Sequence, residues 1–282
     1  MSLLHQLMHG WLSWTPPSWS AGGTLATARY VLGGAGTLTA GLAIGGKSDI
    51  TGLSYATCEE YDGASWTAGG SMAATKEDGG SFGSQTAGAQ VAGITSAAYA
   101  STTYVYDGAS WSASGAYYVA LARNVGAGAQ SAGLSIGGDN GGGAVNTSYE
   151  FGGASWSAGG NLASSKTSMG ACGAQTAGLA AGSSSSSVVT EEYDGTTWSA
   201  GGNLVTGGSQ PIQNGVQTDA LHANGGTYVA TVGTQHYDGT TWSTASNMTA
   251  GRSNHAAGGT AASALHFAGY GATTLDTTQE FQ

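Results

Sequence analysis

This sequence has little positive charge. Only six of its 282 residues are Lys or Arg, against 16 Asp or Glu, and the formal net charge at pH 7 is -10. Such a chain lacks the basic surface that binds nucleic acid or anionic lipid, so both are excluded as partners. No apolar run approaches the roughly 20 residues that a membrane helix needs, and the first basic residue is Arg29. We therefore expect neither membrane insertion nor a secretory signal.

Cysteine is scarce too, and neither it nor histidine forms a ligand motif. Cys58 and Cys172 form no CxxC pair, and we expect buried free thiols. The four histidines of the last two units form no HxH or HxxxH pair, so the histidines are expected in loops or a solvated groove, and no metal site or cofactor is predicted. No GxSxG elbow and no distinctive pair of acids is present, so no catalytic residue is predicted. The six histidines are His5, His9, His222, His236, His255 and His266.

Glycine, with 51 residues, and aromatic residues are plentiful by contrast, and they recur at fixed spacing. A hexapeptide reads YDGASW at 61–66 and 106–111, FGGASW at 151–156, and YDGTTW at 193–198 and 237–242. Six tryptophans spaced 42 to 47 residues apart divide the chain into units one to six: Trp19, Trp66, Trp111, Trp156, Trp198 and Trp242. Internal repeats of this kind indicate one architecture built from copies.

The period of the repeat predicts the fold. A period in the forties with frequent turn signals is typical of a four-stranded propeller blade, and no long helical stripe appears after Trp14. Backbones crowd at a propeller axis, so the Gly/Ala-rich segment of each unit is predicted to be the innermost strand. Its marker is a glycine seventeen residues after each tryptophan: Gly36, Gly83, Gly128, Gly173, Gly215 and Gly259. A second set of glycines is predicted to form the hairpin turn into strand two: Gly41, Gly88, Gly133 and Gly178.

The hexapeptide itself is predicted to be the hairpin between strands three and four. Asp-Gly forms the tight turn, and the flanking Tyr and Trp anchor it against the neighbouring blade. The aspartates are therefore turn residues: Asp62, Asp107, Asp194 and Asp238. The glutamates of strand three are expected to face solvent: Glu59, Glu150, Glu191, Glu192 and Glu280.

The two ends of the chain carry complementary parts of one unit. The stretch TTQEFQ at 277–282 matches strand three of the other units, and PPSWSAGG at 16–23 matches strand four. A sheet built from both termini closes the ring and removes exposed sheet edges. The prediction is an all-β, six-bladed propeller over residues 14–282, preceded by a docking segment over residues 1–13.

The units resemble the kelch repeat. Gly-Gly follows an apolar strand at Ile44-Gly45-Gly46 and Ile136-Gly137-Gly138, and a Tyr and a Trp come later in the unit. Ten positions after the tryptophan, where kelch units carry an arginine, four units have a basic residue: Arg29, Lys76, Lys166 and Arg252. Units three and five carry Leu121 and Gly208 there. The resemblance covers about residues 14 to 282 and implies a kelch-like propeller, a fold that by itself gives no function.

A narrower resemblance is to the low-charge kelch-like repeats of proteins encoded by tailed phages, especially marine ones. It is carried by EEYDGTTWSAGGNL at 191–204 and GAQTAGLA at 173–180. It implies a non-enzymatic virion surface protein, such as an appendage, tail-fibre or decoration component. The implied partners are other virion proteins, further copies of the chain in the virion, and a host surface glycan or protein. The alternatives are a propeller enzyme that processes or oxidises carbohydrate, and a cellular kelch-like adaptor that binds a peptide.

Two sets of residues are candidates for binding. The twelfth position after each tryptophan varies among units, and kelch-type adaptors bind ligands at this end of the channel: Val31, Asp78, Arg123, Ser168, Gln210 and Asn254. The other set is an apolar stripe at helical spacing in the first 13 residues: Leu3, Leu4, Leu7, Met8, Trp11 and Leu12. A helix this short is marginal alone, so we expect it to dock on its own propeller or on another virion protein.

Overall fold

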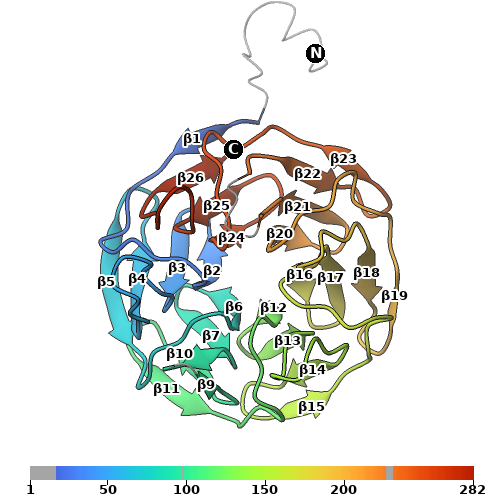
Figure 1. The fold of residues 1–282 in the computed structure, drawn as a ribbon, viewed down its shortest axis with the longest axis horizontal. Helices are drawn as coiled ribbons and strands as arrows, with labels where there is room; N and C mark the ends of the chain where they lie inside the picture. The colour runs from blue at the N-terminus through green and yellow to red at the C-terminus, as the bar shows by residue number, and fades with distance from the viewer. Residues whose placement is uncertain (1–16, 97, 227–230) are drawn as a thin grey trace, which may run out of the picture.

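The computed structural model describes residues 17–96, 98–226 and 231–282, which form a ring of six small sheets (Figure 1). Each sheet has four antiparallel strands, and these residues contain no helix. The predicted all-β, six-bladed propeller is confirmed. The apolar stripe lies outside the described residues: Leu3, Leu4, Leu7, Met8, Trp11 and Leu12.

The blades follow the order of the repeat units, each from the axis outward. Blade one has β2 (Gly33–Thr37), β3 (Ala40–Ile44), β4 (Thr57–Tyr61) and β5 (Trp66–Ser71). Blade two has β6 (Gly80–Ser84), β7 (Ala87–Val91), β10 (Thr103–Tyr106) and β11 (Trp111–Ser114), with a small hairpin of β8 (Ile94–Thr95) and β9 (Ala98–Tyr99) in one loop. Blade three has β12 (Val125–Ala129), β13 (Ala132–Ile136), β14 (Ser148–Phe151) and β15 (Trp156–Ala158).

The second half of the ring repeats this plan. Blade four has β16 (Gly170–Ala174), β17 (Ala177–Ala181), β18 (Thr190–Tyr193) and β19 (Trp198–Ala200). Blade five has β20 (Ile212–Val216), β21 (Asp219–Ala223), β22 (Thr234–Tyr237) and β23 (Trp242–Thr244). Blade six has β24 (Ala256–Gly259), β25 (Ala264–Phe267), β26 (Thr278–Phe281) and β1 (Trp19–Ala21).

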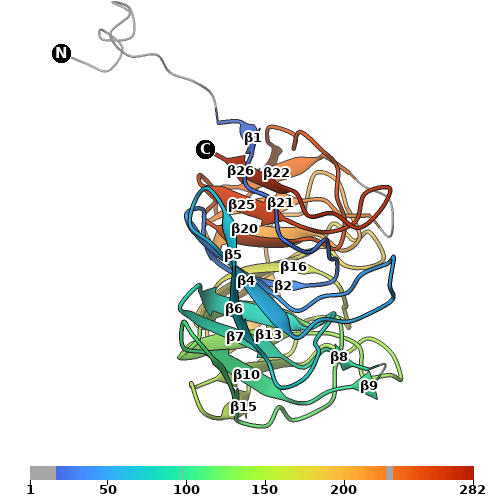
Figure 2. The ribbon, with the colours of Figure 1, turned by 90° about the vertical axis from the view of Figure 1, so that its left-hand side faces the viewer.

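Blade six contains strands from both ends of the described chain. Its outermost strand β1 pairs antiparallel with β26, in the register Trp19↔Phe281, Ser20↔Glu280 and Ala21↔Gln279. The two strands lie side by side in both ribbon views (Figures 1 and 2). Trp19 is buried and contacts Phe281, with ring centroids 5.1 Å apart. The first described strand therefore completes the sheet that the last strands begin.

The innermost strands require glycine at one position. The six glycines seventeen residues after the tryptophans all have positive φ, from 97° to 108°. A Cβ atom there would lie 2.0 to 2.4 Å from a carbonyl oxygen across the hairpin. No other residue meets both conditions, which explains why this position is constant across the units.

The second set of glycines does not form the turn that we predicted. In blade one the turn is at Leu38 and Thr39, and Gly41 is the second residue of β3. A Cβ on Gly41 would lie 2.5 Å from Cδ2 of Leu265 in the preceding blade. Gly88, Gly133 and Gly178 meet a large apolar side chain of their preceding blade in the same way. These glycines make room for packing between blades.

The outer hairpins have the predicted structure. In each YDG turn one carboxylate oxygen of the aspartate accepts two backbone N–H groups; Asp62 Oδ1 accepts from Ala64 N at 2.9 Å and Ser65 N at 2.7 Å. These hydrogen bonds lower the pKa of the exposed Asp62, Asp107, Asp194 and Asp238. The four aspartates are turn residues, as predicted.

The glutamates of strand three were predicted to face solvent, but Glu59 and Glu191 are buried and the other three are half-buried. The tyrosine of one YDG motif donates its hydroxyl to a glutamate of the preceding blade: Tyr61 to Glu280, Tyr106 to Glu60, Tyr193 to Glu150 and Tyr237 to Glu192. Where strand three carries Val105 instead of glutamate, the next blade carries Phe151 instead of tyrosine. The tyrosine and glutamate therefore form one hydrogen bond between neighbouring blades, and are present or absent together.

Two other glutamates of this set are buried with a basic residue. Glu59 is 4% exposed and its Oε1 lies 2.5 Å from Nη2 of the buried Arg29. Glu191, 2% exposed, pairs with Lys166 in the same way. A second carboxylate oxygen of each glutamate accepts a loop N–H, from Ala26 and Ala163. The basic residues ten positions after the tryptophans thus lie inside the protein.

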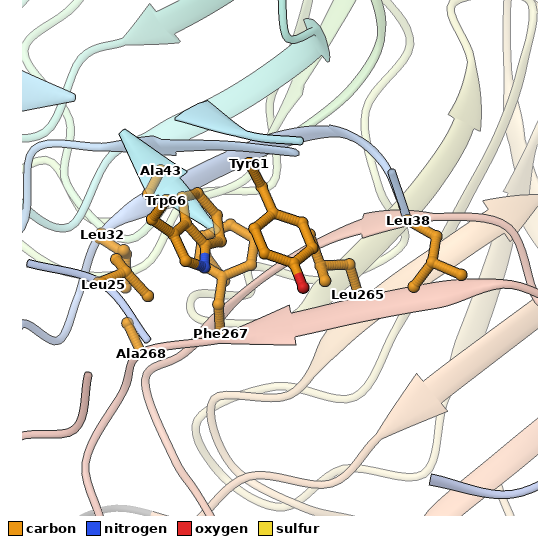
Figure 3. Packing of buried hydrophobic residues seen from close by; sticks show 10 residues of the cluster. Leu25, Leu32, Leu38, Ala43, Tyr61, Trp66, Leu265, Phe267 and Ala268 are labelled. Carbon is orange, nitrogen blue, oxygen red and sulfur yellow. The ribbon is translucent and has the colours of Figure 1, made fainter. Parts of the chain in front are cut away.

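Aromatic residues fill the space between blades (Figure 3). Trp66 of blade one packs on Tyr61, with ring centroids 4.9 Å apart, and on Phe267 of blade six, at 4.8 Å. Its Nε1 donates to Thr278 Oγ1 at 2.9 Å, also in blade six. The core of this protein is therefore a set of interfaces between blades, which explains why the units repeat a Trp and a Tyr or Phe.

Candidate binding surface at the channel mouth

The six residues at the twelfth position share one unusual backbone conformation. Their φ values lie between 48° and 59°, in the left-handed region that side chains other than glycine rarely adopt: Val31, Asp78, Arg123, Ser168, Gln210 and Asn254. Each stands where the chain passes from the outer strand of one blade to the inner strand of the next.

Backbone hydrogen bonds between these residues account for the conformation. Val31 N donates to Asn254 O at 2.9 Å, Asp78 N to Val31 O at 2.8 Å, and Arg123 N to Asp78 O at 2.6 Å. Ser168 N continues the series to Arg123 O at 3.0 Å. These four bonds involve only main-chain atoms and link five of the six rim residues, so the backbone there is held while the side chains are free to differ.

The rim encloses the entrance to a central channel. All six rim residues line one cavity of about 140 Å³. A second cavity of about 150 Å³ continues along the inner strands. The two cavities share one lining residue from each blade: Gly34, Ser81, Gly126, Ala171, Gln213 and Ala257. The structure therefore brings all six predicted rim residues together around one opening, and Gln213 has the largest side chain on its floor.

The side of the mouth formed by units two and three carries paired polar groups. Arg123 Nε lies 3.2 Å from Asp78 Oδ2, and its Nη1 lies 3.4 Å from Asp139 Oδ2. Burial raises the pKa of Asp78, and the Arg123 guanidinium opposes this rise. Asn124 uses both ends of its amide, accepting from Gly80 N and donating to Ser135 Oγ. The side chains of Asp78, Arg123 and Asn124 on this side therefore have protein partners.

The side of the mouth formed by units five and six carries polar groups that have no hydrogen-bond partner. Gln213 and His255 are 5% exposed and Asn254 is 9% exposed, and all three line the mouth cavity. The buried side-chain atoms without a hydrogen-bond partner, among the described residues, are mostly in these two units: Gln210 Oε1, Gln213 Oε1, His222 Nε2, Arg252 Nε, Asn254 Nδ2 and His255 Nδ1, with Gln90 Oε1 in unit two. Unpaired buried polar atoms are costly, so a cluster of them calls for a functional explanation.

Our expectation of solvated histidines is wrong for three of them. His222 and His266 are fully buried on the second strands of blades five and six, and His255 lies beside them at the mouth. His255 Nε2 lies 3.1 Å from His266 Nδ1, and His266 Nε2 lies 2.6 Å from Asn214 Oδ1. Among the described histidines only His236, on β22, has a solvent-accessible side chain, and it contacts Asp219; His5 and His9 lie outside the described residues.

One feature of the sequence indicated the side of the mouth that units five and six form. The inner strand of unit five reads IQNGV, whereas the corresponding segments of units one and four read GGAGT and GACGA. Two amides replace small residues at the crowded axis, an exchange with no packing reason. We used this position only to place the strand and so missed Gln213 and Asn214.

Comparisons with known proteins leave the geometry as the main guide. The chain matched neither the protein-family models nor the curated proteins with which it was compared. Within the described residues, no three His, Cys, Asp or Glu side chains are grouped as metal ligands would be. Over the same residues, no helix has the length and apolar character needed to cross a membrane. Cys58 and Cys172 are buried free thiols, as predicted.

Proposed function

We propose that this chain is a non-enzymatic surface protein of a tailed-phage virion, an appendage, fibre or decoration component that uses the channel mouth to contact the host surface. The observation that carries the binding role is the rim, where six chemically different side chains surround one cavity on a hydrogen-bonded backbone. A fixed backbone with variable side chains is the arrangement of a recognition surface. The kelch-like repeat, in the form found in phage proteins, supports the virion location.

The electrostatics of the mouth favour binding over catalysis. Asp78, the rim carboxylate among the described residues, is hydrogen-bonded to Arg123. A general acid or base needs a proton that it can exchange with substrate, and this pairing opposes that. The hydrogen bonds and aromatic packing between neighbouring blades suit a rigid scaffold that displays the mouth. Such a scaffold fits an assembly with other virion proteins and further copies of the chain.

Particle analysis tests the virion role. Purified particles of the phage that encodes the chain are expected to contain it in fixed stoichiometry by mass spectrometry, at one location by immunogold electron microscopy. A second arm uses Leu4→Ser with Leu7→Ser in the segment over residues 1–13. We expect a folded propeller that is missing from particles, whereas Ile50→Ser, at a side chain 80% exposed, assembles normally. Particles that lack the unaltered chain would overturn the proposal.

A further inference from the structure

Three asparagines of this chain are followed by glycine: Asn140, Asn214 and Asn224. In such a pair the backbone nitrogen of the glycine can attack the side-chain carbonyl carbon of the asparagine. Glycine hinders this attack least, because it has no side chain. The sequence makes the three pairs equivalent, but their surroundings in the structure differ and decide which of them can react.

Asn214 is held inside the protein. It is 3% exposed and lies on the inner strand β20, opposite Leu221 of β21. Its Nδ2 donates to Gly258 O at 2.6 Å, and its Oδ1 lies 2.6 Å from His266 Nε2. The side chain cannot turn toward the nitrogen of Gly215 without breaking both contacts.

Asn224 is held in a similar way. It is half-buried, its Nδ2 donates to Thr206 Oγ1 at 3.1 Å, and its Oδ1 accepts from Gln235 Nε2 at 3.1 Å. The backbone of Gly225 is closely packed as well, since a Cβ there would lie 2.1 Å from Gln210 O. This pair is therefore also fixed in an arrangement that opposes the attack.

Asn140 has no such restraint. It lies in the loop over residues 137–147, between β13 and β14, and the glycines that follow it at 141–143 are exposed like Asn140 itself. Among the described residues its side chain has one hydrogen bond, from Gly142 N to Oδ1 at 2.9 Å, which lies within the loop. A Cβ on Gly143 would meet no atom within 4 Å, so the loop has space around it.

Two neighbours of Asn140 supply the groups that the attack needs. Asp139 Oδ1 accepts from Gly141 N at 2.7 Å, so a carboxylate is in contact with the proton that the attacking nitrogen must lose. A general base has to lie within hydrogen-bond reach of that proton. Gly142 N donates to Asn140 Oδ1, the oxygen on which negative charge develops when Cγ is attacked. The loop therefore places a base and an oxyanion donor beside one reacting pair.

We propose that Asn140 is a site of spontaneous covalent modification. Gly141 N forms a bond to Asn140 Cγ, and its proton passes through Asp139 to Nδ2. The bond from Cγ to Nδ2 then breaks and ammonia leaves, so that a succinimide ring remains. Water adds across either C–N bond of this ring and gives aspartate or isoaspartate at position 140. Nothing is oxidised or reduced, and water is the only co-reactant.

The modification changes the channel mouth beside Arg123. Residue 140 gains a negative charge next to Asp139, whose Oδ2 lies 3.4 Å from Arg123 Nη1. Isoaspartate also lengthens the backbone by one methylene between Asp139 and Ala144, which pair across the loop. The charge and shape of this side of the mouth therefore change with the age of the protein. The chemistry needs only water and the folded chain, so it does not depend on the proposed function.

Incubation of the purified full-length chain at neutral pH, in water enriched in oxygen-18, tests the proposal. The label enters only where a ring opens during the incubation, which separates the reaction of the folded chain from changes during later digestion. Peptide mass spectrometry is expected to show labelled aspartate and isoaspartate at position 140, and unreacted Asn214 and Asn224. An unreacted Asn140, or faster reaction at either of the other two asparagines, would overturn the proposal.

The same incubation in urea that unfolds the chain separates structure from sequence. Unfolding releases the hydrogen bonds of all three asparagines, so we expect their rates to become similar. A preference for Asn140 as strong in urea as in the folded chain would refute the role given to the loop.

Two variants test Asp139 as the base. Asp139→Ser keeps a side-chain acceptor for Gly141 N but removes the carboxylate. We expect the reaction to slow about tenfold, less than a fully enclosed general base contributes, because solvent can also take the proton. Asp78→Ser is the matched control, since it removes the other carboxylate beside Arg123 and installs the residue of unit four, Ser168. It should react as the unaltered chain does, whereas an unaltered rate in Asp139→Ser would contradict the assignment of the base.

Discussion

Blades one and four differ from blades five and six in how they treat equivalent buried positions. In blades one and four a buried base meets a buried acid, as Lys166 meets Glu191. In blade six the base Arg252 remains but the acid is replaced by Gln279, and in blade five Gly208 and Gln235 stand at the two positions. The strand register is the same, so the difference is chemical. Blades one and four therefore neutralise their buried base, whereas blades five and six keep polar groups unpaired beside the channel.

The largest expected effect comes from making blade four resemble blade six. Glu191→Gln leaves the charge of Lys166, which is 6% exposed, without a counter-ion. We expect a loss of about 3 kcal/mol in the free energy of unfolding, because an uncompensated buried charge is strongly destabilising. Urea denaturation measures it.

Lys166→Met with Glu191→Gln is the control for this change. Removing the charge together with its partner should recover most of the loss, since buried ion pairs are often replaceable by apolar residues. If the single and double variants were equally destabilised, the buried pair would not be what distinguishes blades one and four from blades five and six.

A smaller effect is expected from the hydrogen bond between neighbouring blades. Tyr106→Phe removes the hydroxyl that donates to Glu60 Oε1 and accepts from Gly70 N, and should cost about 1–2 kcal/mol. Adding Glu60→Val reproduces the pair Val105 and Phe151 that the chain already uses, and should restore stability. The double-mutant cycle is read from unfolding midpoints, and additive costs would contradict a coupled pair.

The smallest effect is a pH dependence that belongs to blades five and six. Burial lowers the pKa of His222 to about 3, from 6.5 in the unfolded chain, so the unfolded state binds the extra proton between these values. Stability is therefore complete above pH 6.5 and falls as the pH drops. His222 alone should contribute a loss of about 1 kcal/mol between pH 7 and pH 5.5.

His222→Gln installs the residue of blade two, Gln90, and should lessen the slope of the stability profile over this range by the share of one histidine, since His255 and His266 remain. Thermal melts from pH 7 to pH 5.5 show the change, above the range in which most carboxylates titrate. An unaltered slope in His222→Gln would mean that the histidine is not buried neutral.

The sequence predicted the features that repetition enforces. The invariant glycines have a backbone that only glycine adopts, and the Tyr and Trp of each unit meet the neighbouring blade, so periodicity alone located both. The rim followed too, because its position is set by distance from the tryptophan.

What the sequence did not predict depends on neighbours from other units. We predicted that Glu192 on strand three faces solvent, yet Tyr237 of the next blade donates its hydroxyl to it. His266 and His255 lie close because an inner and a second strand pair, and no spacing in the sequence marks that contact. The unpaired polar atoms at the mouth arise from single residues that differ from the other units in units five and six. A search for positions that are constant among the units does not find them.

The pairing of β1 with β26 gives the ring a mechanical weak point. A pull on the chain ahead of Trp19 is carried by a strand of only three residues, Trp19–Ala21, on the outside of blade six. The other outermost strands are each continued at both ends by connections to neighbouring strands within the ring. Under tension β1 is expected to detach first, which would expose the edge of β26 while the five other sheets keep all their strands. If the chain is attached ahead of Trp19, β1 would therefore be the first strand to detach under load. The contacts of Trp19 would set the force at which it detaches.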